Sequence, residues 1–272
     1  MGESKKEQRK QEALEIRQKM RKNKATYAIF IILRIFIVLV AVVAFIRGRY
    51  ENVFVCLMTM LLMFAPAIIK HKLQVSLPSV LESIILVFIF CAEILGEIGS
   101  FYTKIPFWDT MLHTVNGFLC AAIGFALLDI LNRDSNIKMQ LSPFFLAIVA
   151  FCFSMTIGVL WEFFEFGADM LLHTDMQKDH VFTYISSVML NPDNLNQPVV
   201  IENITQTTVN GSVLPLNGYL DVGIYDTMKD LIVNFIGAVV FSVIGFFYVK
   251  TRGKGKFAKQ FIPTVESDET DA

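Results

Sequence analysis

Six long apolar runs, separated by shorter polar segments, constrain this chain more than any other feature. Each run is long enough to cross the roughly 30 Å hydrocarbon core of a bilayer as a helix that rises about 1.5 Å per residue. The runs cover residues 26–46, 52–69, 79–96, 108–131, 143–169 and 226–249. We therefore predict an all-α polytopic membrane protein, built as a bundle of about six transmembrane helices.

The same runs set the predicted domain organisation. Residues 26–250 form one transmembrane domain, because no segment of ordinary soluble-domain size remains between the runs. Residues 1–25 are predicted to be a basic tail, and residues 251–272 a second tail. Residues 170–225 form the one sizeable loop of the membrane domain, which we call the outer loop.

Composition excludes several other classes of protein. Of the 272 residues, 54% are apolar and 18% are charged, whereas an ordinary soluble domain has about 25% charged residues. The four cysteines lie within the apolar runs and have no metal-binding spacing, which argues against a disulfide scaffold. The larger basic block, residues 1–25, contains no aromatic residue, so the expected partner is a lipid bilayer and not a nucleic acid.

Lysine and arginine are distributed unevenly between the two sides of the predicted bundle. The segments on one side, which include both tails, hold 18 of them, and the segments on the other side hold 4. Because basic loops stay on the cytoplasmic side, we predict cytoplasmic termini and an extracytoplasmic outer loop. The first run has no small-residue cleavage site after it, so it is an anchor and not a cleaved signal. The predicted location is the bacterial cytoplasmic (inner) membrane.

The outer loop contains a strong hairpin signal. Residues 207–209 and 212–214, in a segment rich in β-branched residues, flank the pair Asn210-Gly211. Such a pair accepts the positive φ angles that a tight two-residue turn requires. We therefore expect a small extracytoplasmic β-hairpin in this loop.

Polar residues gather at one end of four spans. Within each motif they share a helix face, because they are three or four residues apart. They are Glu93 and Glu97; Asp109 and His113; Glu162, Glu165 and Asp169; and Asp226, Asp230 and Asn234. Gly117 and Gly237 follow two of these motifs and favour close helix packing. The predicted topology places all four ends on the extracytoplasmic side. Inserting a carboxylate at the centre of a membrane helix costs roughly 2.5–3.5 kcal/mol of free energy. The gathering of several carboxylates at one end of the spans therefore predicts an outward-facing acidic site.

Three interpretations of this acidic site remain open. Oxygen ligands with one imidazole suit a divalent cation such as Mg²⁺, Mn²⁺ or Zn²⁺. Alternatively, protonated carboxyl groups relay protons, or the groups hydrogen-bond from helix to helix around a water-filled vestibule. The candidate metal ligands are Asp109, His113, Glu162, Glu165, Asp169, Asp226 and Asp230. All of these except Asp169 are also candidate catalytic groups, and Lys229 and Asn234 are candidates for orienting a substrate.

Three spaced motifs also carry a family resemblance. They are Asp109-x3-His113-x3-Gly117, Trp161-Glu162-x2-Glu165 and Asp226-x3-Asp230-x3-Asn234-x2-Gly237. In this order they resemble the YjdF-like family of uncharacterised bacterial inner-membrane proteins, over roughly residues 80–250. A fainter likeness, carried by the Asp-x-x-x-His pattern, is to VanZ-like membrane proteins. The resemblance supports the topology and marks the residues, and it implies no activity.

Three functions fit these observations. The first is a metal-assisted hydrolase or transferase acting on an envelope lipid, in which the metal activates water or polarises a phosphoryl or acyl oxygen. The second is a cation- or proton-coupled transporter, although the inner half of the spans has little polarity. The third is a non-catalytic membrane component that presents its outer loop to a partner. The chain has no serine elbow and no HExxH signature that would decide between them.

Overall fold

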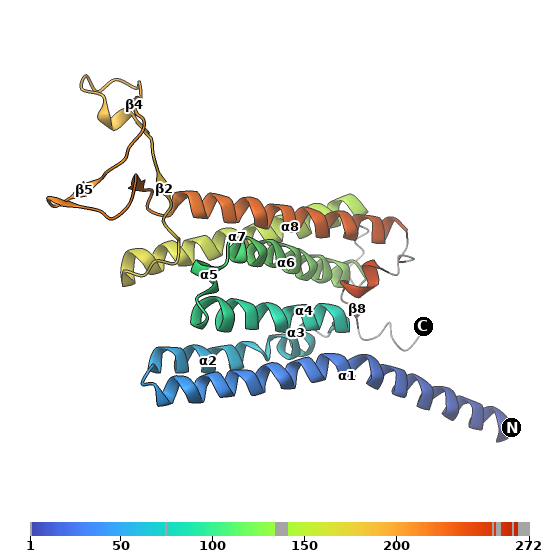
Figure 1. Cartoon of the computed structure of the whole chain (residues 1–272). Coiled ribbons are helices and arrows are strands. Elements are labelled where there is room, and N and C mark those ends of the chain that lie inside the picture. Colours follow the sequence, from blue (N-terminus) through green and yellow to red (C-terminus); the bar gives the residue numbers. More distant parts are fainter. Residues whose placement is uncertain are drawn as a thin grey trace. The chain divides into compact units, whose positions relative to one another are not determined.

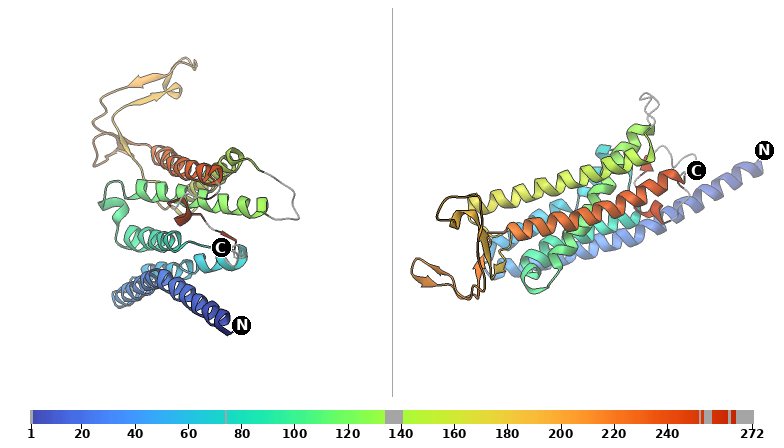
Figure 2. Two further views of the ribbon diagram at one scale, coloured as in Figure 1. Left: turned by 90° about the vertical axis from the view of Figure 1, so that its right-hand side faces the viewer. Right: turned by 90° about the horizontal axis from the view of Figure 1, so that it is seen from above.

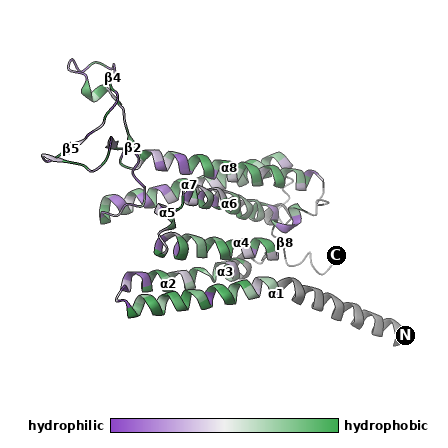
Figure 3. Ribbon diagram, viewed as in Figure 1, coloured by the Kyte–Doolittle hydropathy of each residue, from purple (hydrophilic) through white to green (hydrophobic). Residues whose placement is uncertain are grey.

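A computed structural model describes residues 2–73, 75–133, 141–251, 253, 257–262 and 264–265 of a mostly helical chain (Figure 1). Six helical stretches are long and apolar enough to cross a membrane, which confirms the predicted fold class (Figure 3). They are Lys24–Ile46, Tyr50–Ile69, Ser79–Ile98, Trp108–Asp129, Pro143–Leu172 and Ile224–Lys250. The chain divides into two compact units, residues 1–156 with 233–272, and residues 157–232.

The helices follow the predicted spans closely. Helix α1 is continuous from Gly2, so the residues predicted to be a basic tail extend the first span as a helix. In the first unit, α1 packs against α2 and α4 (Figure 2). The helix bounds are α1 Gly2–Ile46, α2 Tyr50–Leu62, α3 Ala65–Leu73, α4 Ser79–Phe90, the π-helix η1 Cys91–Ile98, α5 Phe101–Lys104, α6 Trp108–Arg133, α7 Pro143–Leu172 and α8 Ile224–Lys250.

The second span is interrupted between α2 and α3. Arg34 of α1 donates a hydrogen bond to a backbone carbonyl at this interruption. The N–H of Phe64 bonds three residues back instead of four, so the carbonyl of Met60 loses its usual helical donor. The Arg34 guanidinium donates to this carbonyl at 3.2 Å. It also lies 4.5 Å and 4.2 Å from the ring centroids of Phe30 and Phe64. A cation at this depth is thus matched by a carbonyl dipole and two π faces.

Two glycines bring α6 and α8 into backbone contact. A Cβ atom at Gly117 would lie 2.1 Å from the carbonyl oxygen of Asn234, and one at Gly237 would lie 2.0 Å from that of Thr114. Further along, Gly245 of α8 lies against the ring of Phe125 on α6, so the two helices run parallel. This confirms the predicted close packing, because only glycine leaves room for such a crossing.

A buried polar network lies at this crossing, and we call Asn116, Ser154 and Asn234 the crossing network. The hydroxyl of Ser154 donates to the carbonyl of Gly117 at 2.7 Å. The amide nitrogen of Asn116 lies 3.4 Å from the amide oxygen of Asn234, whose own nitrogen lies 3.5 Å from the carbonyl of Ser154. These bonds connect α6, α7 and α8, as polar side chains between membrane helices commonly do.

After α8 the chain folds back on the first unit. A short 3₁₀ turn, η3 (Ala258–Gln260), is followed by strand β8 (Thr264–Val265), which pairs antiparallel with β1 (Val75–Ser76). Ala258 and Ile262 are buried in the same apolar cluster as residues of α4, α6 and α8. Part of the segment predicted to be a C-terminal tail therefore packs in the core, and the rest of that prediction lies outside the described residues.

The second unit holds the outer loop with the adjoining ends of α7 and α8. Its strands form three antiparallel pairs, β2 with β7, β3 with β4, and β5 with β6. The expected hairpin is the β5–β6 pair, in which Asn210 and Gly211 have φ angles of 51° and 79°. The strand bounds are β2 Val181–Phe182, β3 Ile185–Ser187, β4 Val199–Ile201, β5 Thr208–Val209, β6 Ser212–Val213 and β7 Tyr219–Leu220, with a 3₁₀ turn η2 at Val188–Leu190.

One carboxylate, Asp221, ties the two ends of this loop together. It accepts hydrogen bonds from the backbone N–H groups of His180 at 2.7 Å, Tyr225 at 2.8 Å and Gly223 at 3.3 Å. Burial alone would raise the pKa of Asp221, but these three donors hold its pKa below the ordinary value. Asp221 thus caps the start of α8 and fixes the loop that leads into it.

Replacing Gly117 by alanine tests the α6–α8 crossing. The added methyl group must displace the backbone of α8, which we expect to cost about 1–3 kcal/mol through overpacking. The matched control is Gly167→Ala on α7, where no atom lies within 4 Å of the added Cβ. We expect thermal unfolding in detergent to show a lower Tm for Gly117→Ala only. An equal Tm for the two variants would contradict the close packing.

The depressed pKa of Asp221 predicts an acid-labile loop. The stabilisation is complete above the unfolded-state pKa of about 3.9, and it is lost as the pH falls through the lower folded-state value. Amide-exchange protection factors of His180 and Tyr225 should therefore stay constant from about pH 8 to 5 and decline below about pH 4. The Asp221→Asn variant should lack this decline, and the exposed Asp193→Asn control should keep it. A decline that persists in Asp221→Asn would rule out this carboxylate as its source.

Candidate functional site

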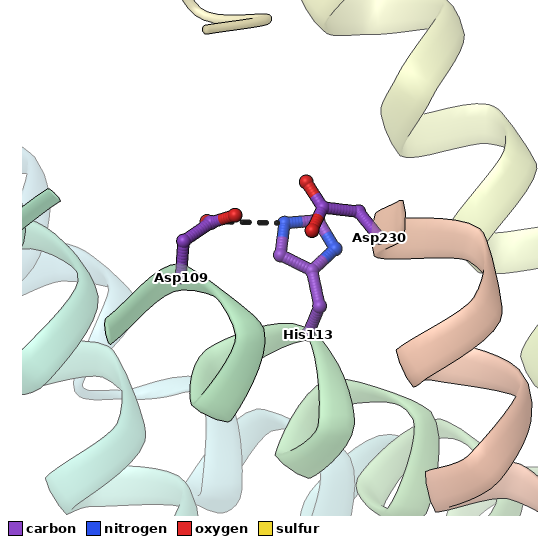
Figure 4. A group of neighbouring side chains, drawn as sticks. All are labelled: Asp109, His113 and Asp230. Carbon is purple, nitrogen blue, oxygen red and sulfur yellow. Dashed lines mark ion pairs between the residues drawn. The ribbon is translucent and has the colours of Figure 1, made fainter. Parts of the chain in front are cut away.

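Helix α6 begins with a carboxylate beside an imidazole. Asp109 and His113 are one turn apart, and the Nε2 atom of His113 lies 3.5 Å from an Asp109 carboxylate oxygen (Figure 4). Their side chains are 24% and 12% exposed, so both are largely withdrawn from solvent and lipid. The preceding Trp108 packs edge-on against Phe101, and its buried indole N–H has no hydrogen-bond acceptor in the part of the chain that the structure describes. The first six residues of α6 thus carry a carboxylate, an imidazole and an indole N–H.

Helix α7 carries its carboxylates on one buried face. Glu162 and Glu165 are 4% and 8% exposed, whereas Phe163 and Phe164 between them are 66% and 57% exposed. The indole N–H of Trp161 donates to a Glu165 oxygen at 2.8 Å. This arrangement confirms the shared face that the spacing predicts. It also gives Trp161 a polar contact within the acidic motif.

Helix α8 repeats the pattern with a lysine added. Asp226, Asp230 and Asn234 are all buried along one face. The ammonium group of Lys229 lies 2.7 Å from Asp226 and 3.9 Å from Asp230. One cation therefore faces two buried carboxylates on this turn. Asn234 belongs to the crossing network, where its amide connects helices.

Two of the predicted metal ligands accept hydrogen bonds from the outer loop. One carboxylate oxygen of Asp169 accepts from the Thr174 hydroxyl and the Met176 N–H, and the other accepts from the Gln177 N–H. Asp226 accepts from the backbone N–H of Lys178 at 3.0 Å with the oxygen that does not face Lys229. Both oxygens of each carboxylate are therefore occupied by donors within the second unit.

The third predicted span contributes its acidic pair on an unusual element. Glu93 and Glu97 lie on the eight-residue π-helix η1, with Glu93 half-buried and Glu97 exposed. The ring of Tyr102, on α5, packs directly over Gly96 of η1. Long π-helical segments are rare and often occur at functional sites. In the first unit, α6 packs against this segment.

Three of the predicted ligands make up a candidate metal centre. Asp109, His113 and Asp230 form a group of one imidazole and two carboxylates that could hold a metal ion, and Figure 4 draws these three side chains. Oxygen and imidazole ligands in this ratio suit Mn²⁺, Zn²⁺ or Mg²⁺. These three are among the seven ligands predicted from the sequence, and the other four stay predictions.

Sequence reasoning missed several polar residues around the motifs. Asn116 and Ser154 complete the crossing network, and Gln177 is buried with its side-chain amide donating to the Thr227 hydroxyl. Asp129 is also buried near the far end of α6, in the half predicted to have little polarity. Asn116 stands three residues after His113, a spacing that shares the motif face, and this signal could have revealed it.

Comparisons with known proteins agree with this architecture. A family model described as "Predicted membrane protein (DUF2238)" matches residues 28–251. The chain is similar to an uncharacterized protein of Thermotoga maritima, with 28% identity over 109 residues, which are 40% of this chain and 54% of that relative. The chain thus matches about half the length of this curated relative. No solved structure matches. Because the family model covers most of the chain, the protein belongs to the DUF2238 family of predicted membrane proteins.

Proposed function

We propose that this protein is a metal-assisted hydrolase or transferase that acts on an envelope lipid. Asp109, His113 and Asp230 would hold one divalent cation, either Mg²⁺, Mn²⁺ or Zn²⁺. The observation that carries the proposal is this group of one imidazole and two carboxylates, which could hold a metal ion. We further propose that the chain is a YjdF-like member of its family.

The chemistry of the other motif residues supports this assignment. A bound divalent cation lowers the pKa of a water ligand and polarises a phosphoryl or acyl oxygen. Glu162 and Glu165 are buried carboxylates on one helix face, which suits them to accept and return a proton. Lys229 would face the negative charge of a lipid phosphate. Asn234 would act indirectly, because its hydrogen bonds hold α8 against α6 and α7.

The proposed location of the chemistry is the extracytoplasmic leaflet of the bacterial cytoplasmic membrane. Helices α6 and α8 run parallel and carry their acidic turns at their first residues. The outer loop leads directly into the start of α8, and the excess of Lys and Arg lies on the opposite side. A site at this end is at the depth of lipid headgroups, where an ester or phosphodiester bond is within reach. Both chain termini would then be cytoplasmic.

Metal analysis tests the proposed centre directly. Protein purified without chelator should contain about one equivalent of Mn²⁺, Zn²⁺ or Mg²⁺ by ICP-MS, and the same ion should raise the Tm of the chelated protein. We expect Asp109→Asn, His113→Ala and Asp230→Asn each to weaken metal binding by more than about 10–100-fold. That range is the usual loss of metal affinity when a residue that only hydrogen-bonds to a metal ligand is mutated. The matched control is Asp175→Asn, an exposed carboxylate of the outer loop. Wild-type protein with neither bound metal nor a metal-dependent Tm shift would refute the centre.

A second set of variants separates metal ligands from loop anchors. Asp169→Asn and Asp226→Asn should keep the metal, because the carboxylates of Asp169 and Asp226 are occupied by loop and lysine donors. Both variants should instead be cleaved faster by trypsin at Lys178 in the outer loop. The native carboxylates hold the backbone of residues 176–178 by hydrogen bonds, which the variants weaken. Loss of metal in Asp169→Asn without a change in proteolysis would show that the wider, seven-residue ligand set is correct.

A further inference from the structure

The turn between strand β7 and helix α8 holds a β-branched residue in a strained backbone conformation. Val222 has a φ angle of 63°, in the left-handed region that β-branched residues rarely adopt. The Asp221 carboxylate fixes the backbone around it by accepting from the N–H groups of His180, Gly223 and Tyr225. The side chain of Val222 is nevertheless 82% exposed. The fold therefore keeps a strained residue whose apolar side chain lies outside the protein.

The start of α6, in the first unit, shows the same combination. Phe107 has a φ angle of 67° and is 81% exposed, and α6 begins at the next residue, Trp108. Strained residues of this kind persist only where the surrounding structure holds them, and they gather at functional positions. In water neither side chain gains from its exposure, because apolar surface is unfavourable there. Lipid is the environment in which both positions are favourable.

Val222 adjoins a group of exposed apolar and tyrosine side chains, which we call the loop-base surface. The β2–β7 pair places Val181 beside Leu220. Behind them the ring centroid of Phe182 lies 5.5 Å from that of Tyr225 and 6.1 Å from that of Tyr184. The members of the surface, with exposed fractions between 38% and 82%, are Val181, Tyr184, Leu220, Val222, Ile224 and Tyr225.

The loop-base surface continues the lipid-facing side of the two helices in its unit. Ile224, Met228 and Ile232 are four residues apart on α8 and are all exposed. On α7 the exposed apolar residues continue to the end of the helix, at Leu171 and Leu172. In a membrane span such an apolar face contacts lipid. The same lipid contact therefore extends without a break from α8 through Ile224 to the loop-base surface.

The length of α8 brings this surface to the depth of lipid headgroups. The 27 residues of α8 rise about 40 Å at 1.5 Å per residue, and a bilayer with both headgroup regions is about 40–45 Å thick. The last residue of α8 is Lys250, a cation that belongs at the opposite interface. Strand β2 adjoins the start of α8, whereas the β5–β6 hairpin projects away from it (Figure 1).

Charge attraction does not explain binding of this surface to a membrane. Residues 181–225 contain no Lys or Arg, and their three acidic residues would be repelled by anionic headgroups. Burial of apolar and aromatic side chains must supply the binding instead. Tyrosine suits this depth, because its ring enters the apolar region while its hydroxyl stays among the headgroups.

We propose that the loop-base surface binds the boundary between headgroups and acyl chains of the adjoining leaflet. The turn at Val222 holds the apolar side chains at a fixed position relative to the first turn of α8. Binding would thus fix the depth of that turn, which carries Asp226. The base of the outer loop would be a membrane-bound element, and the β5–β6 hairpin would lie in the water beyond it. This binding requires no metal.

A depth measurement in nanodiscs of phosphatidylcholine and phosphatidylglycerol tests the proposal. In a variant whose four native cysteines are replaced by alanine, the fluorophore NBD is attached at Val222→Cys. The matched control is Val209→Cys of the β5–β6 hairpin, which is also apolar and exposed. A lipid with a nitroxide on its headgroup should quench NBD at residue 222 at least about twofold more than at residue 209, because only residue 222 lies at headgroup depth. The difference should persist in about 1 M salt, which screens charges beyond roughly 3 Å.

Two aspartate variants test whether the surface binds as a unit. Val181→Asp should reduce quenching at residue 222 to the level of the hairpin control, and Val213→Asp, in the hairpin, should leave it unchanged. If Val222→Cys does not fold, Ile224→Cys carries the same readout. Equal quenching at residues 222 and 209 would overturn the proposal. Blue-shifted NBD emission at residue 222 without quenching by the nitroxide lipid would show a protein contact in place of lipid, and would overturn it as well.

Discussion

The contact between α6 and α8 is the constraint on which the rest of the structure depends. Gly117 and Gly237 allow the two backbones to touch, and the crossing network adds hydrogen bonds to α7 at the same level. Apolar side chains supply little drive for association inside a bilayer, so close packing and interhelical hydrogen bonds must hold such a crossing. Both helices carry their acidic motifs in the turns before the crossing. The glycines therefore set the framework on which the carboxylates are displayed.

Much of this architecture could be predicted, because the bilayer imposes simple rules. A span needs about 20 apolar residues, and its buried face repeats every 3.6 residues. These rules identified the six spans, the shared face of Glu162 and Glu165, and that of Asp226 and Asp230. The turn at Asn210 followed from backbone sterics alone. Each of these features depends on residues that are neighbours along one element.

The features that escaped prediction depend on partners far apart in sequence. Asp226 binds a backbone N–H 48 residues away, a donor that no side-chain pattern reveals. The basic, polar residues after α8 look like a solvated tail, yet Phe261 and Ile262 among them pack into the bundle. The π-helix around Glu93 also has no recognisable sequence pattern, because a widened helical turn needs no special residue type.

The hydrogen bonds of the acidic residues are the reason that the proposed metal centre is restricted to three of the seven predicted ligands. A buried carboxylate is stable only when donors or cations replace its lost hydration. Asp169 meets this requirement with loop donors, Asp226 with Lys229 and a backbone N–H, and Glu165 with an indole N–H. Lys229 also faces Asp230, at 3.9 Å. The paired Asp109 likewise depends on His113, which is a cation only when protonated. In the proposed centre, a divalent cation would add positive charge beside Asp109 and Asp230 and would leave the imidazole of His113 neutral, as a metal ligand requires.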